Sequence, residues 1–83
     1  MGRDEIFNVI KRVVSEILPD VDSGAVTQDK SLKELGANSI DRVEIVTMVL
    51  ENLNIKMSPV ELGGISNIEG LVDALFKKVN SSQ

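Results

Sequence analysis

Chemistry in this chain can rest on few residue types, and one serine stands out among them. The sequence has no cysteine and no histidine, so it lacks the thiolate nucleophile, the commonest general base and the commonest zinc ligands. Ser39 lies between a loop containing Gly36 and a segment with regular apolar spacing. We expect Gly36 to let the loop approach closely and leave the Ser39 hydroxyl open to another protein's active site.

Two roles for Ser39 follow from this position. Serine is a favoured helix N-cap, whose oxygen accepts an amide proton two or three residues further on, and most such serines do nothing more. A phosphodiester attached to Ser39 would instead lie beside free backbone amides at the positive end of the helix dipole. The local pattern alone leaves both roles open.

No other residues of the chain are spaced as a catalytic pair. Serine, threonine, aspartate, glutamate, lysine and arginine remain for site chemistry, and none of them forms a defensible acid–base arrangement. We therefore expect no catalytic residues, no bound metal and a protein that is not an enzyme.

The charge of the chain is acidic and unevenly distributed. The net charge is −4, and between residues 39 and 73 only Arg42 and Lys56 are basic. The acidic residues of this stretch are Asp41, Glu44, Glu51, Glu61, Glu69 and Asp73. Because nucleic-acid binding needs clustered lysine and arginine, we expect no nucleic-acid partner. Protein partners with basic patches would be attracted.

Nothing in the sequence predicts membrane insertion or export. No run of about 18 apolar residues is present. The first residues also lack the basic-then-apolar pattern of a signal peptide. We expect a cytoplasmic protein with no membrane partner, and since no feature favours a stable dimer, a monomer.

Apolar residues at three- and four-residue spacing predict two helices in the first two thirds of the chain. The first begins near Asp4 and ends before Pro19, because the residue preceding a proline is pushed out of helical geometry. The second runs from about Ser39 to Leu53, where Asn54 can end it in left-handed geometry.

The last third of the chain contains two further helix starts. Residues 58–61 read Ser-Pro-Val-Glu, a capping box with proline at the first helical position, and Gly63-Gly64 stops the short helix that it begins. Ser66 and Glu69 repeat the capping-box pattern before a final helix. That helix carries Ile68, Leu71, Val72, Leu75 and Val79. The polar tail at 80–83 is expected to fray.

These elements predict an all-α fold. Residues 20–30 form a long polar loop, and the turn at 31–35 would tuck Leu32 and Leu35 under the core. We expect a small four-helix bundle with three longer helices, one short helix and a long loop after the first helix. The chain would form a single domain over residues 1–83.

The second predicted helix has two distinct faces. Its core face comprises Ile45, Val46, Val49, Leu50 and Leu53. The opposite face comprises Ile40, Val43, Glu44, Thr47 and Glu51, with Met48 beside it. Ile40 could simply pack against the loop or the short helix, since a single exposed apolar residue needs no special explanation. Alternatively, this face docks partners through its apolar residues, with the carboxylates attracting basic side chains.

The order of these motifs resembles that of acyl carrier proteins. The chain has a first amphipathic helix, a long loop, Leu35-Gly36-x-x-Ser39, a second helix with Val43-Glu44-Ile45, a proline-started short helix and a final aliphatic helix. In that family the loop reads Gly-x-Asp-Ser-Leu and the serine carries 4'-phosphopantetheine, whose thiol holds acyl groups as thioesters. The resemblance implies that Ser39 is the attachment position and that a phosphopantetheinyl transferase modifies it.

The resemblance also implies a surface for partners, since carrier proteins present the start of this helix to their enzymes. The predicted docking face comprises Asn38, Ile40, Asp41, Arg42, Val43, Glu44, Thr47, Met48 and Glu51. The chain departs from the family pattern in having Asn38 where most carriers have an acid, and Ile40 in place of leucine. The lost charge at Asn38 predicts slower or more selective modification.

Within the family, three segments of the chain resemble those of one narrow group of carriers. They are the run from Asn38 to Ile45, Met48-x-x-Glu51-x-Leu53 and Val60-Glu61-Leu62-Gly63-Gly64. The members of this group are free-standing donor carriers of the cassettes that install β-branches during bacterial polyketide assembly. The resemblance implies an acetyl cargo loaded through an acyltransferase and a decarboxylating ketosynthase-like enzyme, then donated to a hydroxymethylglutaryl-type synthase. Acceptor carriers of such systems tend to have a tryptophan after the serine, and this chain has none. The alternatives are a carrier for ordinary polyketide or fatty-acid chain extension, and an unmodified helical adaptor.

Overall fold

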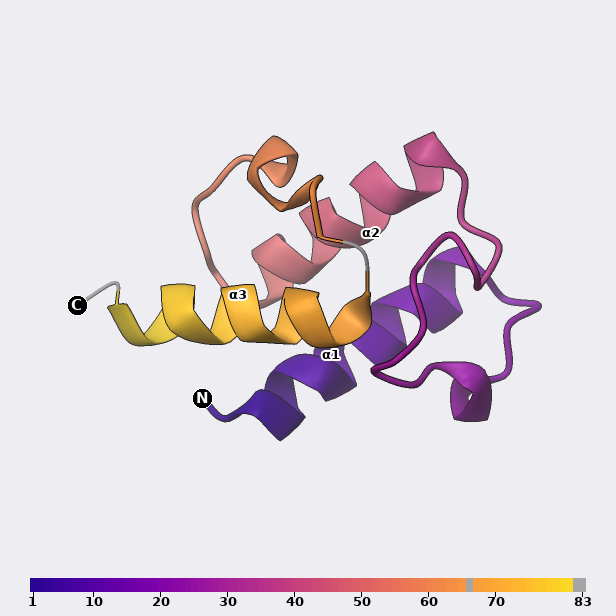
Figure 1. Cartoon of the computed structure of the whole chain (residues 1–83), viewed down its shortest axis with the longest axis horizontal. Helices are drawn as coiled ribbons and strands as arrows, with labels where there is room; N and C mark the ends of the chain where they lie inside the picture. The colour runs from indigo at the N-terminus through magenta and orange to yellow at the C-terminus, as the bar shows by residue number, and fades with distance from the viewer. Residues whose placement is uncertain (66, 82–83) are drawn as a thin grey trace.

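Three amphipathic helices pack around one apolar core in the computed structural model, which describes residues 1–65 and 67–81 (Figure 1). The helices are α1 (Arg3–Ile17), α2 (Ser39–Asn52) and α3 (Ile68–Ser81), and α1 packs against both of the others. The start of α1 and the end of α3 lie at the end of the molecule far from the start of α2. The described residues are helical or irregular and include no strand, as the sequence predicts.

The core is built from the apolar residues that recur along each helix. Its buried members are Ile6, Ile10, Val13, Val14, Val26, Leu32, Ala37, Ile45, Val49, Leu50, Leu53, Leu62, Ile68, Leu71, Val72 and Leu75. Four of the five residues predicted for the core face of α2 belong to this set, and the fifth, Val46, is partly buried against it. The periodicity of the sequence therefore identifies the buried side of α2 correctly.

The predicted ends of α1 and α2 are confirmed with their physical causes. Leu18 caps α1 directly before Pro19, and its amide donates to the Val14 carbonyl at 2.7 Å. After α2, Asn54 has a φ of 56°, the left-handed geometry that asparagine tolerates. The Ile55 amide then donates back to the Leu50 carbonyl at 2.9 Å, which satisfies a carbonyl at the helix end.

At the predicted short fourth helix the chain forms a 3₁₀ turn, η2 (Pro59–Leu62), so the described residues contain the three predicted longer α-helices and a single 3₁₀ turn in place of a short α-helix at this point. The capping box that starts it is present: the Ser58 hydroxyl accepts from the Val60 amide, and the Glu61 carboxylate accepts from the Ser58 amide. Only four residues separate this cap from Gly63, too few to establish repeated α-helical hydrogen bonds. The turn nevertheless packs against α2 and buries Leu62.

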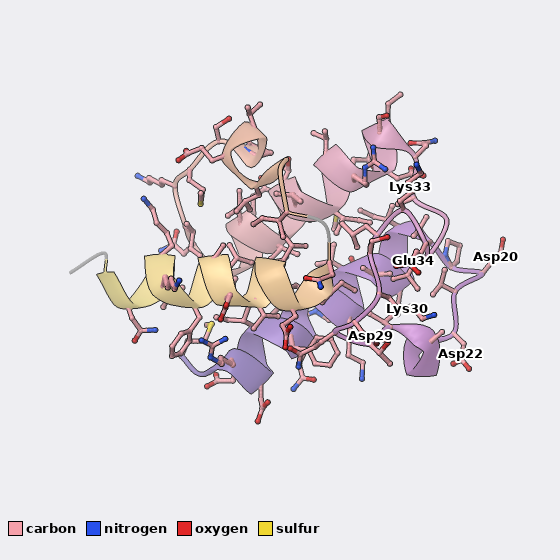
Figure 2. The ribbon with its side chains drawn as sticks, viewed as in Figure 1. Asp20, Asp22, Asp29, Lys30, Lys33 and Glu34 are labelled. Atoms are coloured by element: carbon pink, nitrogen blue, oxygen red, sulfur yellow. The ribbon has the colours of Figure 1, made fainter. Side chains whose placement is uncertain are left out.

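The long loop between α1 and α2 is more ordered than its composition predicts. It contains the 3₁₀ turn η1 (Ser23–Ala25), in which the Gly24 amide donates to the Asp22 carboxylate. It also contains a second turn, in which Ser31 and Glu34 exchange side-chain-to-backbone hydrogen bonds. The second turn matches the predicted one, with Leu32 buried and Leu35 partly buried. Figure 2 shows the charged side chains that this loop carries, at the end of the molecule away from the start of α1 and the end of α3.

The loop is also fixed to the start of α3. The Ile68 amide donates to the Lys30 carbonyl and the Glu69 amide donates to the Gln28 carbonyl, each at 2.9 Å. Amides in the first turn of a helix have no intrahelical acceptor, so the loop backbone satisfies two of them here. This pairing joins segments that the sequence separates widely.

Asn67 provides a further hydrogen bond at the start of α3, because its side-chain oxygen accepts from the Gly70 amide at 2.8 Å. The predicted capping box at Ser66 lies outside the described residues. At its other end α3 continues through Asn80 to Ser81, beyond the predicted end at Val79. The rest of the tail predicted to fray, residues 82 and 83, also lies outside the described part. None of the helices in the described ranges is long and apolar enough to cross a membrane.

Candidate functional site

Ser39 occupies the first position of α2, and the residue before it provides the cap. The Asn38 side-chain oxygen accepts from the Asp41 amide at 2.8 Å, and the Asp41 carboxylate accepts from the Asn38 amide at 3.3 Å. This reciprocal capping box corrects the alternative in which Ser39 itself caps the helix. Among the described residues, nothing hydrogen-bonds the Ser39 hydroxyl, and the residue is exposed. The hydroxyl is therefore available for chemistry.

Gly36 shapes the loop that leads into Ser39 through its backbone conformation. Its φ is 101°, a left-handed value that residues with a Cβ adopt only under strain. A Cβ added at Gly36 would meet no atom within 4 Å, so the expected close approach of the loop is wrong as the reason for glycine here. The glycine instead lets the chain reverse between the turn at Ser31–Leu35 and the cap at Asn38.

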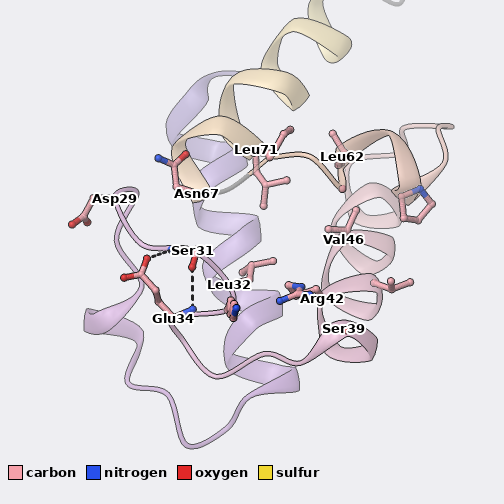
Figure 3. Close-up of a pocket in the computed structure, with 15 residues that line it drawn as sticks. Asp29, Ser31, Leu32, Glu34, Ser39, Arg42, Val46, Leu62, Asn67 and Leu71 are labelled. Carbon is pink, nitrogen blue, oxygen red and sulfur yellow. Dashed lines mark hydrogen bonds between the residues drawn. The ribbon is translucent and has the colours of Figure 1, made fainter.

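An open groove of about 680 Å³ begins at Ser39 and runs between α2, η2, the start of α3 and the loop at 29–34 (Figure 3). Its lining comprises Asp29, Ser31, Leu32, Lys33, Glu34, Ser39, Arg42, Val43, Val46, Pro59, Leu62, Gly63, Ile65, Asn67 and Leu71. Its volume falls in the range of sites that hold organic ligands, roughly 300–1,000 Å³. The floor is apolar, and the charged residues come from α2 and the loop.

The carboxylates of the groove are engaged locally, whereas its arginine is not. Glu34 accepts from the Ser31 amide at 2.9 Å, and Asp29 accepts from the Thr27 hydroxyl. In the part of the chain that the structure describes, the Arg42 guanidinium forms no ion pair with any of these groups. Arg42 is partly buried, and Figure 3 shows its side chain extending from α2 toward the loop that carries Leu32.

The Asp29 carboxyl is held in its charged form. The hydrogen bond from Thr27 is the largest cause, and the Asp29 backbone amide and the nearby Lys30 charge also contribute; together they lower the pKa of Asp29 from its usual value. All three of these groups belong to the loop itself. Asp29 therefore remains a negative group at the edge of the groove at neutral pH.

The structure divides the predicted docking face into exposed and engaged residues. Ile40 and Val43 are 73% and 57% exposed, and Glu44 and Glu51 are exposed beside them. This excludes the interpretation in which Ile40 packs against the loop or the short turn. An apolar pair flanked by carboxylates is thus open to solvent at the start of α2.

Other residues of the predicted face have structural contacts. Asp41 and Asn38 form the cap, Met48 packs against the core, and Thr47 is partly buried. Val43 also lines the groove, so it lies between the groove and the exposed face. The docking role of all these positions stays a prediction.

Beneath the groove, the core is closed. A second cavity of about 10 Å³ lies among Ile10, Ile45, Val49, Leu75 and the groove residues Val46, Leu62 and Leu71. A space of this size is at the limit of what holds one water molecule. No cluster of three acidic side chains in the described residues is close enough to hold a metal ion.

Comparison with known proteins identifies the protein family that has this serine and groove. A family model described as a phosphopantetheine attachment site matches residues 8–75, which include Ser39 and all the residues that line the groove. The chain belongs to the acyl carrier protein family. Its cofactor is 4'-phosphopantetheine, which supplies a flexible arm with a thiol for thioester formation.

Individual relatives cover the carrier almost completely. It is 43% identical over 82 residues to the polyketide biosynthesis acyl-carrier-protein AcpK of Bacillus subtilis, an alignment that spans 99% of this chain and 100% of that one. It is 38% identical to an acyl carrier protein of Guillardia theta, over 95% of this chain and 98% of that one.

A solved structure gives the same fold. The carrier superposes with a TM-score of 0.79 on a chain in the crystal structure of the curacin biosynthetic pathway HMG synthase in complex with acetyl donor-ACP. The two chains are 36% identical, and the match covers 92% of this carrier and 96% of that chain.

The residues of the carrier fit the cofactor. Ser39 lines the groove at the start of α2; the residue is exposed, and its hydroxyl has no hydrogen-bond partner among the described residues. The groove beside it is large enough to hold an organic ligand. Sequence reasoning missed most of the groove, including Lys33, Pro59 and Ile65, and also Val60, which is 84% exposed on η2. The capping box at Ser58 predicted where η2 begins. Because the turn has only four residues, the sequence has no periodicity there that would indicate that Val60 faces outward.

Proposed function

We propose that this protein carries acyl groups on phosphopantetheine attached to Ser39, and that its role is that of an acetyl donor in polyketide β-branching. The observation that carries the attachment is the Asn38 cap, which leaves the Ser39 hydroxyl without a partner among the described residues. The carrier acts by presenting a tethered substrate to partner enzymes rather than by catalysis. We place it in the cytoplasm as a monomer.

The proposed attachment step takes place in a partner's active site. The Ser39 oxygen attacks the β-phosphate of coenzyme A, a new phosphodiester forms, and the pyrophosphate bond breaks. Adenosine 3',5'-bisphosphate leaves, and the serine proton goes to a base of the phosphopantetheinyl transferase. The carrier contributes an exposed hydroxyl held at the first position of α2.

Four observations support the acetyl-donor role. The match to a chain of an HMG synthase–acetyl donor complex covers nearly all of the carrier, and the polyketide carrier AcpK is 43% identical. The sequence has no tryptophan, which acceptor carriers of such systems tend to have after the serine. The closed core, with about 10 Å³ beneath the groove, suits a cargo that stays outside.

The attachment is tested by intact-protein mass after incubation with coenzyme A and a broad-specificity phosphopantetheinyl transferase. Wild type and Ser58→Ala should each gain one phosphopantetheine, whereas Ser39→Ala should gain none. Ser58 is the matched control because it is an exposed serine in a capping box, directly before the groove residue Pro59. Modification of Ser39→Ala, or loss of modification in Ser58→Ala alone, would contradict the assignment.

The donor role is tested with the acetylated carrier and an HMG-type synthase acting on an acetoacetyl acceptor carrier. We expect the synthase to consume acetyl from this carrier, and a plain fatty-acid carrier to support the reaction poorly. Equal rates from both would favour ordinary chain extension, which is the second candidate because several plain acyl carrier proteins are 30–38% identical.

The size of the cargo gives an independent test. Methyl chemical shifts of Ile45 and Leu75 should be unchanged when the arm is acetylated, because the cavity that these two side chains line, about 10 Å³, is too small for an acetyl group. Large shifts at these buried methyls would mean that the core opens to take the cargo.

A further inference from the structure

We propose that Arg42 holds the phosphodiester of the carrier's own arm and directs that arm along the groove between α2, η2 and α3. The inference rests on the proposed attachment at Ser39. It assigns to Arg42 a positioning role within the carrier, separate from any contact with a partner enzyme.

The position of Arg42 carries the first part of the argument. Arg42 follows Ser39 by three residues on α2, and residues at this spacing are neighbours on a helix surface. Both residues line the same groove. In Figure 3 the Arg42 side chain extends from α2 toward the loop that carries Leu32, so an arm on Ser39 that enters this groove passes near the guanidinium.

The electrostatics of the groove carry the second part. Arg42 is partly buried and, within the described residues, has no carboxylate partner. The available carboxylates are engaged elsewhere: Glu34 by the Ser31 amide and Asp29 by the Thr27 hydroxyl. A phosphodiester on Ser39 would bring a permanent negative charge into reach of this cation. Guanidinium groups bind phosphate oxygens through paired hydrogen bonds, which fixes direction as well as distance.

The lining of the groove carries the third part. Beyond Arg42 the walls become apolar, with Val46, Leu62, Ile65 and Leu71, and the volume of about 680 Å³ is large enough for a pantetheine chain. The geminal methyl groups of pantetheine are its apolar part, and they follow the phosphate directly. A phosphate held at Arg42 therefore places these methyls against the apolar walls.

The test uses the full-length carrier in its loaded form, after mass spectrometry has shown one phosphopantetheine on each variant. NOEs are measured between the pantetheine methyls and the methyls of Leu62 and Leu71. We expect these NOEs in wild type. In Arg42→Gln their intensities should be about twofold to fivefold lower, the fold-change that loss of a surface ion pair produces. In Arg42→Lys the intensities should lie between those of wild type and Arg42→Gln. Arg12→Gln is the matched control, because it removes the same charge from α1, away from the groove lining.

Two further readouts separate this role from a merely structural one. The Arg42 Nε–Hε signal should shift when apo carrier is converted to loaded carrier, while the Arg12 signal should not. The NOEs should also weaken at roughly 1 M salt, where the screening length falls to about 3 Å. These readouts use wild type alone, so they hold even if Arg42→Gln folds poorly.

The outcomes distinguish the inference from the function on which it rests. Loaded wild type without NOEs from arm to groove, or with NOEs unchanged in Arg42→Gln, would overturn the role of Arg42 and leave the carrier function standing. An effect of Arg42→Gln on synthase kinetics without any change in the NOEs would assign Arg42 to the partner interface instead. Failure of wild type to accept phosphopantetheine at Ser39 would overturn both.

Discussion

The assignment of the α2 cap to Asn38 rather than Ser39 makes a sharp prediction about two neighbouring alanine substitutions. In the unmodified protein Asn38→Ala should be destabilising, whereas Ser39→Ala should not. The reason is that the Asp41 amide donates to the Asn38 side chain at 2.8 Å, while no described residue hydrogen-bonds the Ser39 hydroxyl.

The magnitude follows from what each substitution removes. Asn38→Ala loses one half of the capping box and leaves the other half, from the Asn38 amide to Asp41, in place. Loss of an N-cap side chain costs about 1 kcal/mol, which is a drop in melting temperature of roughly 4–8 °C for a domain of this size. Ser39→Ala replaces serine by a better helix former, so the free energy of unfolding should be unchanged or higher by up to about 0.5 kcal/mol.

Urea unfolding followed by circular dichroism measures both effects. With a slope of about 1 kcal/mol per molar urea, Asn38→Ala should lower the midpoint by roughly 1 M. Asn38→Asp serves as the control, since aspartate is an equally good N-cap and places a negative charge at the helix start. Asn38→Asp should be as stable as wild type or more stable.

The reverse pattern would refute the reasoning. If Ser39→Ala were destabilising by about 1 kcal/mol and Asn38→Ala neutral, Ser39 would be the cap after all. Its hydroxyl would then be engaged in the free protein, and the proposed availability for modification would lose its basis.

Further predictions concern packing, docking and pH. Gly70→Ala should lower the free energy of unfolding by about 1 kcal/mol, because a Cβ would lie 2.6 Å from Cγ2 of Ile65 and overpacking outweighs the gain in helix propensity. An Ile65→Leu background lacks that methyl, so the loss should become smaller there, with the contact of 3.2 Å to Oδ1 of Asn67 remaining. Glu44→Lys should reduce HMG-type synthase turnover by about tenfold at low salt and much less at high salt, and its circular dichroism spectrum should match that of wild type. Equal turnover of Glu44→Lys and wild type at low salt would contradict an acidic docking face. Thr27→Val should raise the pKa of Asp29, measured by NMR titration. Because the pKa is depressed in the folded protein, the stabilisation is present above the unfolded value near about 3.9 and is lost as pH falls through the folded pKa, so the two proteins should converge in stability at low pH.

The helices were predictable because their ends have local causes. Pro19 and Asn54 each end a helix through their own backbone preferences, and these preferences act regardless of the rest of the fold. The capping box at Ser58 also acts locally, but it determines only where a turn begins. Whether the turn becomes an α-helix depends on how many residues follow, and Gly63 comes too soon.

The site was predictable only in part, because it combines local and distant causes. Ser39 was found from its neighbours, but Asn38 and Ser39 are both good caps, and the sequence does not decide between two adjacent candidates. The groove depends on segments near residues 30, 43, 62 and 71 meeting in space. No periodicity relates such segments, so their assembly becomes visible only in the fold.

The pairing of the loop with α3 has a consequence for how the carrier opens locally. The Ile68 and Glu69 amides lose their acceptors as soon as the backbone at Lys30 and Gln28 moves away, and the same backbone continues into the wall of the groove. Closing this contact also requires a long, entropically costly chain segment to be in place first. Hydrogen exchange at these two amides therefore reports the opening of the groove wall directly, at positions distant in sequence from Ser39.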